Sequence, residues 1–402
     1  MSHASLPTFQ EQNTPDDSDS TGDASSTNTL HALARLPEDW QNLLESWGER
    51  PYRAKQIFRW IFAQRVLDPD KMSNLPPSLR EKLRSLPFGK LPEVEVVKRA
   101  ADGTRKLLLA LDENSRVECV LIPMVPKVSW DAETFDFEDD EDKPSDKQTR
   151  VTLCVSTQYG CAMGCTFCES GRAGLKRGLR AEEIIAQVVV AKSYLEPSES
   201  LTNLVLMGMG EPLHHYDATA RALRVLTHPE GLDMSLRRIT VSTVGLIRGI
   251  ERLGQDFSGK VGLAVSLHAP NDELRSQIIP INRRYPLARL MEALRRYPLP
   301  RRRRITIEYT LIAGFNDGFE QARQLSQLLR GLAVKINLIP MNTIEGSNLR
   351  ASSSDRVAEF QDYLARDGYS CFVRTRRGDD VAAACGQLAF RSAAPTKVEH
   401  ID

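Results

Sequence analysis

Four of the chain's seven cysteines fall within fifteen residues, although the whole sequence has 402. Three of them, Cys161, Cys165 and Cys168, lie in the stretch YGCAMGCTFC with the spacing C-x3-C-x2-C. Gly160 and Gly164 give the backbone freedom to curl, so three thiolates can point at one face of an iron–sulfur cube. A fourth iron is then left without a protein ligand, and an open iron can chelate a substrate.

Other uses of clustered thiols fit this pattern less well. Structural zinc also takes thiolates, but it uses four ligands and its cysteines usually come in separated pairs. An electron-transfer ferredoxin supplies a fourth cysteine in the local run, which is absent here. Seven is an odd and low count for a secreted disulfide framework. We therefore expect reduced thiols with a chemical purpose.

The segment that must position these thiols alternates short β-rich runs with helical ones from Val151 to Arg377, which is typical of βαβ units. The strand patterns are TLCVSTQ, NLVLMGM, RITVSTV, GLAVSLHA, RITIEYTLI and VKINLIPM, and the helical ones include AEEIIAQVVVAKSYL, YDATARALRVLTH, PLARLMEALRRY, EQARQLSQLLRGL and SDRVAEFQDYLARD. Six repeats are fewer than the eight of a closed barrel. The sequence predicts an α/β fold built as an open six-stranded (β/α)6 partial TIM barrel. Its first strand is expected to carry Cys154 and to run directly into Cys161.

Smaller units are predicted to flank this barrel. Three helical patterns, PEDWQNLLESW, RAKQIFRWIFAQ and PPSLREKLRSL, predict a small helical module. Three strand-like runs follow, EVEVVKRA, DGTRKLLLAL and RVECVLIPM, and Asp102-Gly103 supplies a hairpin turn. The predicted boundaries are a disordered tail at 1–30, the helical accessory domain at 31–90, a β extension at 91–150 with an acidic insertion at about 126–149, the barrel with a C-terminal segment at 151–390, and a tail at 391–402.

The net charge of zero hides a segregation of charge along the chain. Residues 1–40 hold seven acids and one base, and residues 131–147 hold nine acids and two bases, so the remainder has a surplus of thirteen bases. A basic body favours a polyanionic partner such as nucleic acid, although ordinary solubilising charge gives the same composition. No apolar run reaches the roughly 18 residues of a membrane span, and the first thirty residues lack the features of a signal peptide. We expect a cytoplasmic protein with no membrane partner.

The cysteine loop after the first strand of an incomplete barrel resembles the radical SAM superfamily. Further motifs, TLCVSTQYGCAMGCTFC, MGMGEP, SLHAPND, INRRYP, KINLIPMN and RGDDVAAACGQL, are similar to the RlmN-type adenine-2-methyltransferases of 23S rRNA and tRNA, in the RlmN/Cfr family. The likeness runs from about Pro51 to Leu388 without the acidic insertion. It implies a [4Fe-4S] cluster on Cys161, Cys165 and Cys168, with two molecules of S-adenosylmethionine (SAM) used per turnover.

The resemblance also implies three catalytic residues. Cys385, in AAACGQL, matches the cysteine that carries a methyl group and forms a transient thioether with the RNA. Cys154 matches the second thiol, which releases the product by attacking the tethered sulfur and leaves a disulfide bond. Glu118, in RVECV, matches the proton acceptor at carbon 2. Without the resemblance, Cys154 would be interpreted as a buried strand residue and Glu118 as a solvated side chain. Cys119 matches no residue of the family, and Cys371, in the strand-like SCFVR, is most simply a core residue.

The SAM contacts implied by the resemblance recur at the carboxyl ends of several strands. A carboxylate is the natural partner for the SAM ammonium, whereas a lone Ser or Asn at a strand end is more often a cap or turn residue. The matched residues are Gly210, Glu211, Ser242, Ser266, Leu267, His268 and Asn342.

The predicted partners are 23S rRNA and tRNA, together with an electron donor such as flavodoxin, and we expect a monomer. Arginine clusters that could neutralise phosphates are Arg237-Arg238, Arg283-Arg284, Arg295-Arg296, Arg301 to Arg304 and Arg374 to Arg377 without Thr375. A target adenine must leave its stack to meet buried sulfur chemistry, so we expect a looped substrate.

Two rival functions remain open. The first is a Cfr-type enzyme, which methylates carbon 8 of adenine. The STVG run is more similar to that group, whereas MGMGEP and RGDD are more similar to the carbon 2 enzymes. An RNA-binding protein with a structural or redox-sensing cluster belongs to a different class, and it has no use for Cys385.

Overall fold

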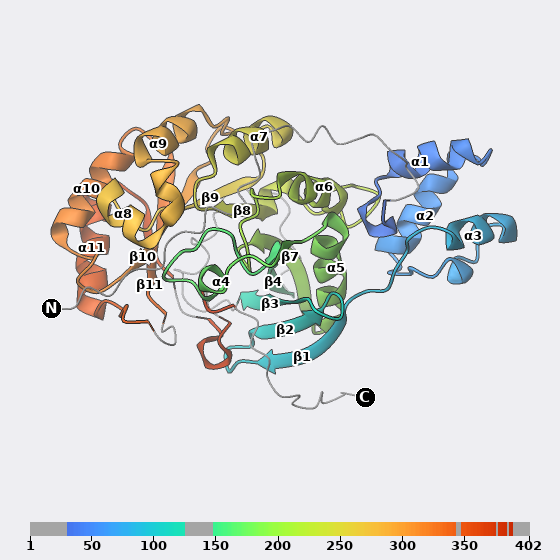
Figure 1. The fold of residues 1–402 in the computed structure, drawn as a ribbon, viewed down its shortest axis with the longest axis horizontal. Helices are drawn as coiled ribbons and strands as arrows, with labels where there is room; N and C mark the ends of the chain where they lie inside the picture. The colour runs from blue at the N-terminus through green and yellow to red at the C-terminus, as the bar shows by residue number, and fades with distance from the viewer. Residues whose placement is uncertain (1–29, 125–147, 343–346, 375–376, 384–385, 389–402) are drawn as a thin grey trace.

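Six parallel strands form the centre of the protein (Figure 1). The structure is a computed structural model that describes residues 30–124, 148–342, 347–374, 377–383 and 386–388. The six strands are β4 (Thr149–Cys154), β7 (Glu199–Leu206), β8 (Ile239–Thr243), β9 (Gly262–Ser266), β10 (Ile305–Leu311) and β11 (Val334–Pro340). Each pairs in parallel with the next. A short seventh parallel strand, β12 (Cys371–Val373), pairs with the outer edge of β11.

Helices connect the parallel strands and lie along the outside of the sheet (Figure 1). They are α5 (Ala181–Ala191), α6 (Tyr216–Leu226), α7 (Ile247–Phe257), α8 (Asp272–Ile278), α9 (Leu287–Arg296), α10 (Phe319–Leu329) and α11 (Ser354–Arg366). Between β9 and β10 the chain forms both α8 and α9. This strand–helix alternation confirms the predicted partial barrel, with β12 as one short strand beyond the six expected.

An antiparallel extension occupies the outer edge of β4. Its strands are β1 (Glu93–Arg99), β2 (Arg105–Ala110) and β3 (Arg116–Met124), and β3 pairs with β4. The sheet order is therefore β1-β2-β3-β4-β7-β8-β9-β10-β11-β12. At the predicted hairpin turn, Gly103 has φ +83° and the Thr104 N–H donates to Asp102 Oδ1 at 2.9 Å. Because β3 takes the edge of β4, β12 cannot pair there and the barrel stays open.

The N-terminal helices form a module beside α5 and α6 (Figure 1). They are α1 (Pro37–Ser46), α2 (Arg53–Phe62) and α3 (Pro77–Arg84), and their inward faces bury Trp40, Phe58 and Leu79 completely. Arg221 of α6 reaches the module, where its Nε donates to the Ala34 carbonyl at 2.6 Å. None of the helices in the described residues is long and apolar enough to cross a bilayer.

Two details differ from the sequence predictions. Strand β4 ends at Cys154 and does not run into Cys161, because the Thr157 and Gln158 N–H groups both donate to the Met209 carbonyl and draw the chain toward the loop after β7. The strand also begins at Thr149, which had been predicted as the end of the acidic insertion. Residues 1–29, 125–147 and 389–402, which hold most of the predicted tails and insertion, lie outside the described residues. The domain boundaries stay predictions.

Candidate active site

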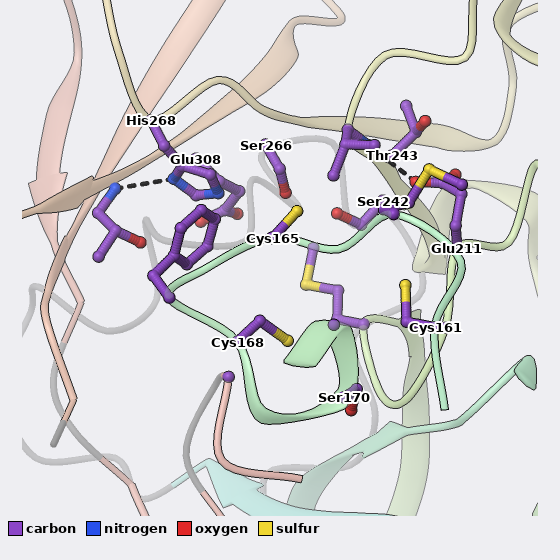
Figure 2. Close-up of a pocket in the computed structure, with 18 of the residues that line it drawn as sticks. Cys161, Cys165, Cys168, Ser170, Glu211, Ser242, Thr243, Ser266, His268 and Glu308 are labelled. Atoms are coloured by element: carbon purple, nitrogen blue, oxygen red, sulfur yellow. Dashed lines mark hydrogen bonds between the residues drawn. The ribbon is translucent and has the colours of Figure 1, made fainter. Parts of the chain in front are cut away.

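A cavity opens at the carboxyl ends of the parallel strands. The three cysteines of the loop line it together with side chains from the ends of β7 to β11 (Figure 2). The predicted SAM contacts that line it are Gly210, Glu211, Ser242, Ser266, His268 and Asn342. Leu267 does not, because its side chain is fully buried and its backbone N–H donates to the Glu308 carbonyl at 3.0 Å. The structure thus gathers six of these seven residues around one space, and their roles stay predictions.

The cysteine loop is shaped by glycines at close backbone contacts. Gly160 has φ +78°, and a Cβ there would lie 1.9 Å from the Gly174 carbonyl oxygen. Gly171, in the short helix α4 (Glu169–Arg172), packs against the loop so closely that a Cβ would meet Cys165 N and O at 2.8 Å each. These contacts curl the loop, and the sulfurs of all three cysteines face the cavity (Figure 2).

The three thiols fit an iron–sulfur cluster electrostatically. Burial raises the pKa of Cys161 and of Cys165, and the neighbouring cysteines raise both further. Three such thiolates are stable together only beside compensating positive charge, which an iron cluster supplies. Across the part of the chain that the structure describes, no group of three or more His, Cys, Asp or Glu side chains is spaced to hold one metal ion.

Arg275 is a fully buried cation behind the cysteine loop. Its guanidinium donates to the carbonyls of Val244 (2.6 Å), Leu267 (3.0 Å) and Ser266 (3.2 Å) and to Asn282 Oδ1 (2.7 Å). It therefore joins the ends of β8 and β9 to the segment around Asn282, in the motif INRR. Burial lowers the pKa of Arg275 to about 10, so it stays charged at neutral pH.

Glu211 is a buried carboxyl held by backbone donors. It accepts from the N–H groups of Val244 (2.9 Å) and Leu213 (3.1 Å), while its own N–H donates to Gln158 Oε1 (3.0 Å). Burial nevertheless raises the pKa of Glu211 to about 7, because these bonds offset only part of the desolvation. A cationic group of a ligand would favour the ionised form.

His268 presents a neutral imidazole to the cavity. Burial, with a smaller contribution from Arg275, lowers its pKa to about 3. The Thr310 N–H donates to its Nδ1 at 2.9 Å (Figure 2), which leaves the proton on Nε2. Its left-handed backbone, at φ +55°, is held by Asn316, whose amide donates to the His268 carbonyl at 2.7 Å.

Glu308 is a cavity residue that the sequence interpretation missed. It belongs to β10 and is 3% exposed. Its Oε1 accepts from Asn337 Nδ2 at 3.1 Å, and its Oε2 has no hydrogen-bond partner among the residues that the structure describes. Burial raises its pKa. A signal was present, because a carboxylate inside the apolar run RITIEYTLI is unusual for a parallel strand covered on both faces.

Lys106 and Glu118 form a buried ion pair on the β extension, outside the cavity lining. Lys106 of β2 pairs in register with Val120 of β3, which pairs with Cys154 at the end of β4. Glu118 lies two residues from Val120 and so points to the same face. Lys106 Nζ lies 2.9 Å from Glu118 Oε1, and each side chain is less than a tenth exposed. The expectation of a solvated Glu118 is therefore wrong, because the ion pair compensates its burial.

The C-terminal segment crosses from this face to the cysteine loop. Lys106 Nζ also donates to the Ala382 carbonyl at 2.9 Å. Farther along, the Glu169 N–H donates to the Gly386 carbonyl at 2.9 Å, directly after Cys168, and Ser170 Oγ donates to the Leu388 carbonyl. Cys385 itself lies outside the described residues. Its neighbours in sequence link the β extension to the cavity.

Comparison with known proteins decides the family. Residues 36–87 match the family model "Ribosomal RNA large subunit methyltransferase N-terminal domain", and residues 155–325 match "Radical SAM superfamily". The chain is 56% identical over 377 residues to the dual-specificity RNA methyltransferase RlmN of Sorangium cellulosum, an alignment that covers 91% of this chain and 97% of that protein. The chain belongs to the RlmN family. It is a radical SAM RNA methyltransferase, with a [4Fe-4S] cluster and SAM as its cofactors.

Other RlmN relatives agree over nearly their whole length. The probable dual-specificity RNA methyltransferase RlmN of Moorella thermoacetica is 44% identical, over 91% of this chain and 99% of that protein. A crystal structure of a radical SAM methyltransferase from Sphaerobacter thermophilus is 40% identical and superposes with a TM-score of 0.79, covering 89% of this chain and 99% of that one. The RlmN fold therefore extends across the helical module, the β extension and the barrel.

Proposed function

We propose that the chain methylates carbon 2 of an adenosine in 23S rRNA and in tRNA through an S-methylated Cys385. The methylated sulfur becomes tethered to the RNA, and Cys154 resolves that tether. The observation that carries the proposal is the pair of hydrogen bonds on either side of Cys385. The Ala382 carbonyl accepts from Lys106, which pairs with Glu118. Four residues later, the Gly386 carbonyl accepts from the first residue of the helix that follows Cys168.

The cavity residues have a binding role in this reaction. Glu211, at the end of the β7 loop, suits the ammonium of SAM, and the neutral His268 offers an Nε2–H donor. When bound, the cluster and SAM supply a methyl group and a radical that can remove hydrogen from a methyl carbon. Three thiols on a tightly curled loop, with Cys165 buried and Cys161 and Cys168 half-buried, support this assignment of the cluster ligands.

The residues of the β extension have a release role. Carbon 2 of adenine is neither nucleophilic nor acidic, so a base must take its proton after a bond to carbon has formed. Glu118 is a buried carboxyl whose Oε1 is held 2.9 Å from the Lys106 ammonium, and a carboxylate fixed in this way can act as the proton acceptor. Cys154 is on the same face and 7% exposed, which suits a thiol that attacks a neighbouring sulfur.

The arginine clusters differ in how well they are placed to contact RNA. Arg237-Arg238 precede β8 and Arg301 to Arg304 precede β10, so they lie at the amino ends of the strands, away from the cavity. Arg374 lines the cavity, and Arg283 ends the turn that follows α8. These two are better placed to meet the phosphates of a looped RNA. The electron donor of the flavodoxin class and the monomeric state stay predictions.

Methylation at carbon 8 is the alternative product. The motif MGMGEP, which places Gly210 and Glu211, and the segment RGDD, which anchors the C-terminal crossing, both favour carbon 2.

The test is anaerobic reconstitution with iron and sulfide, followed by SAM-dependent methylation of 23S rRNA fragments and of tRNA. Mass spectrometry of nuclease digests is expected to find 2-methyladenosine in both RNAs. Only 8-methyladenosine, or no methylated base from a fully loaded enzyme, would contradict the proposal. A regular duplex that contains the same adenosine is expected to be a poor substrate.

A further inference from the structure

Lys106 bonds to two parts of the site at once. Its ammonium lies 2.9 Å from the Glu118 carboxylate and 2.9 Å from the Ala382 carbonyl, three residues before Cys385. Both side chains of the ion pair are less than a tenth exposed. An ammonium has three N–H donors, so it can serve both acceptors together.

Stability alone does not account for this buried pair. Replacing a buried ion pair with apolar side chains of similar volume is often neutral or stabilising, because the pair loses its hydration on folding. The same face of the extension carries Val120 between Lys106 and Cys154 in register, so an apolar lining is compatible with the strands. A function for the charge is the simpler explanation.

Two further bonds hold the same crossing. The Gly378 N–H donates to Asp102 Oδ2 at 3.1 Å, and the Ala101 N–H donates to Asp380 Oδ2 at 3.0 Å. Both lie at the β1–β2 turn, at one end of the strand that carries Lys106. The segment is therefore fixed at its start by the turn and farther along by Lys106.

We propose that Lys106 is a positioning residue for product release, which orients the Glu118 carboxylate and fixes the backbone at Ala382, ahead of Cys385. This inference rests on the proposed function, because it assigns Lys106 to a step of that reaction.

The step balances as follows once the unpaired electron left by radical addition has returned to the iron–sulfur cluster, which leaves a closed-shell cationic adduct whose carbon 2 still carries its proton. That proton passes to the Glu118 carboxylate, and its bonding electron pair returns to the adenine ring. The Cys154 thiolate then attacks the Cys385 sulfur and an S–S bond forms. The sulfur–methylene bond breaks with its electron pair on carbon, and a proton from solvent completes the methyl group.

The test compares Lys106→Met with Lys98→Met in the reconstituted enzyme. Lys98 is the exposed partner of Lys106 in the β1–β2 register, so it controls for loss of a lysine on this sheet. For Lys106→Met we expect methylated RNA to fall roughly 10- to 100-fold, as for an impaired general base. Cys385 is still expected to be methylated, and a covalent protein–RNA species is expected to accumulate on denaturing gels. Lys106→Arg, which keeps the charge, is expected to restore release.

A double variant separates this role from a folding defect. Glu118→Gln removes the charge that Lys106 compensates, so Lys106→Met/Glu118→Gln leaves no buried unpaired ion. If Lys106 acts through Glu118, the double variant accumulates no more adduct than Glu118→Gln alone. Wild-type release by a folded Lys106→Met, or an adduct level in the double variant well above that of Glu118→Gln, would overturn the inference.

Cys154→Ala distinguishes failure of this inference from failure of the proposed function. The proposed function requires that this variant accumulate the adduct. If Cys154→Ala traps the adduct and Lys106→Met does not, only the role of Lys106 is wrong. If Cys154→Ala traps none while RNA is methylated, the two-cysteine reaction itself is wrong.

Discussion

The cavity and the release face, by which we mean the face of the sheet that carries Lys106, Glu118 and Cys154, are built in different ways. Around the cavity, the binding groups lie at or just after the carboxyl ends of consecutive parallel strands, and the order of the strands brings those groups together. On the release face, Lys106 and Glu118 come from an antiparallel extension, Cys154 comes from the first barrel strand, and the covering segment comes from the end of the chain. The cavity is thus a property of the barrel, whereas the release face depends on contacts between segments far apart in sequence.

Loss of one cluster thiol is expected to have the largest effect and to disable both regions. Cys165→Ala removes a buried ligand in the middle of the loop, so iron content and iron–sulfur absorbance should fall sharply, and methylation should become undetectable. No methyl group should reach Cys385 and no adduct should form. Cys371→Ala, at a buried site in β12, is the matched control and should keep its iron. A fully loaded Cys165→Ala would contradict the ligand assignment.

Loss of Arg275 is expected to loosen the cavity alone. Arg275→Met removes the guanidinium donor from two buried and two partly buried acceptors, which should cost roughly 2–5 kcal/mol in the free energy of unfolding. Urea denaturation measures this cost. Arg275→Lys keeps the charge but cannot reach all four acceptors, so it should recover part of the stability. If Arg275→Met unfolds like the wild type, these bonds do not hold the strand ends.

Glu211 gives a pH-dependent way to test the cavity. With its pKa raised to about 7, the carboxyl is protonated below that pH in the ligand-free protein and cannot attract an ammonium. SAM affinity should therefore rise as pH increases through about 7 and level off above it. Glu211→Gln should bind SAM about tenfold more weakly at pH 8 and lose most of this pH dependence. Equilibrium dialysis from pH 6 to pH 8.5 measures both; identical pH profiles would remove Glu211 from the ammonium site.

The smallest expected effect lies at the edge of the release face. Asp102→Ala removes the acceptor for the Thr104 N–H within the turn and for the Gly378 N–H, which is the one of these two bonds that reaches the C-terminal segment, but it leaves the Lys106 contacts intact. Release should slow by about two- to fivefold, since one hydrogen bond contributes about 1 kcal/mol. SAM binding should not change. A loss of SAM affinity in this variant would mean that the two regions are not independent.

The sequence predicted the cavity better than the release face, for physical reasons. Strand periodicity and the C-x3-C-x2-C loop are local patterns, so they indicated the barrel and which residues end its strands. The pairing of Lys106 with Glu118 depends on the register of β2 and β3, and the Ala382 contact spans 276 residues. No local pattern encodes either contact. Arg275 was missed because its burial comes from tertiary packing, whereas Glu308 was missed although the carboxylate inside an apolar strand pattern was a signal for it.

The two outer strands of the sheet bear on how the protein behaves at high concentration. Strand β1 carries Glu93, Glu95, Lys98 and Arg99 and has a bulge between Val94 and Val96, while β12 is only three residues long. Charged, irregular or very short margins resist joining with the strands of another molecule. The ten-stranded sheet is thereby protected against edge-to-edge pairing with another molecule, although its two edge strands, β1 and β12, do not pair with each other in the described part of the chain.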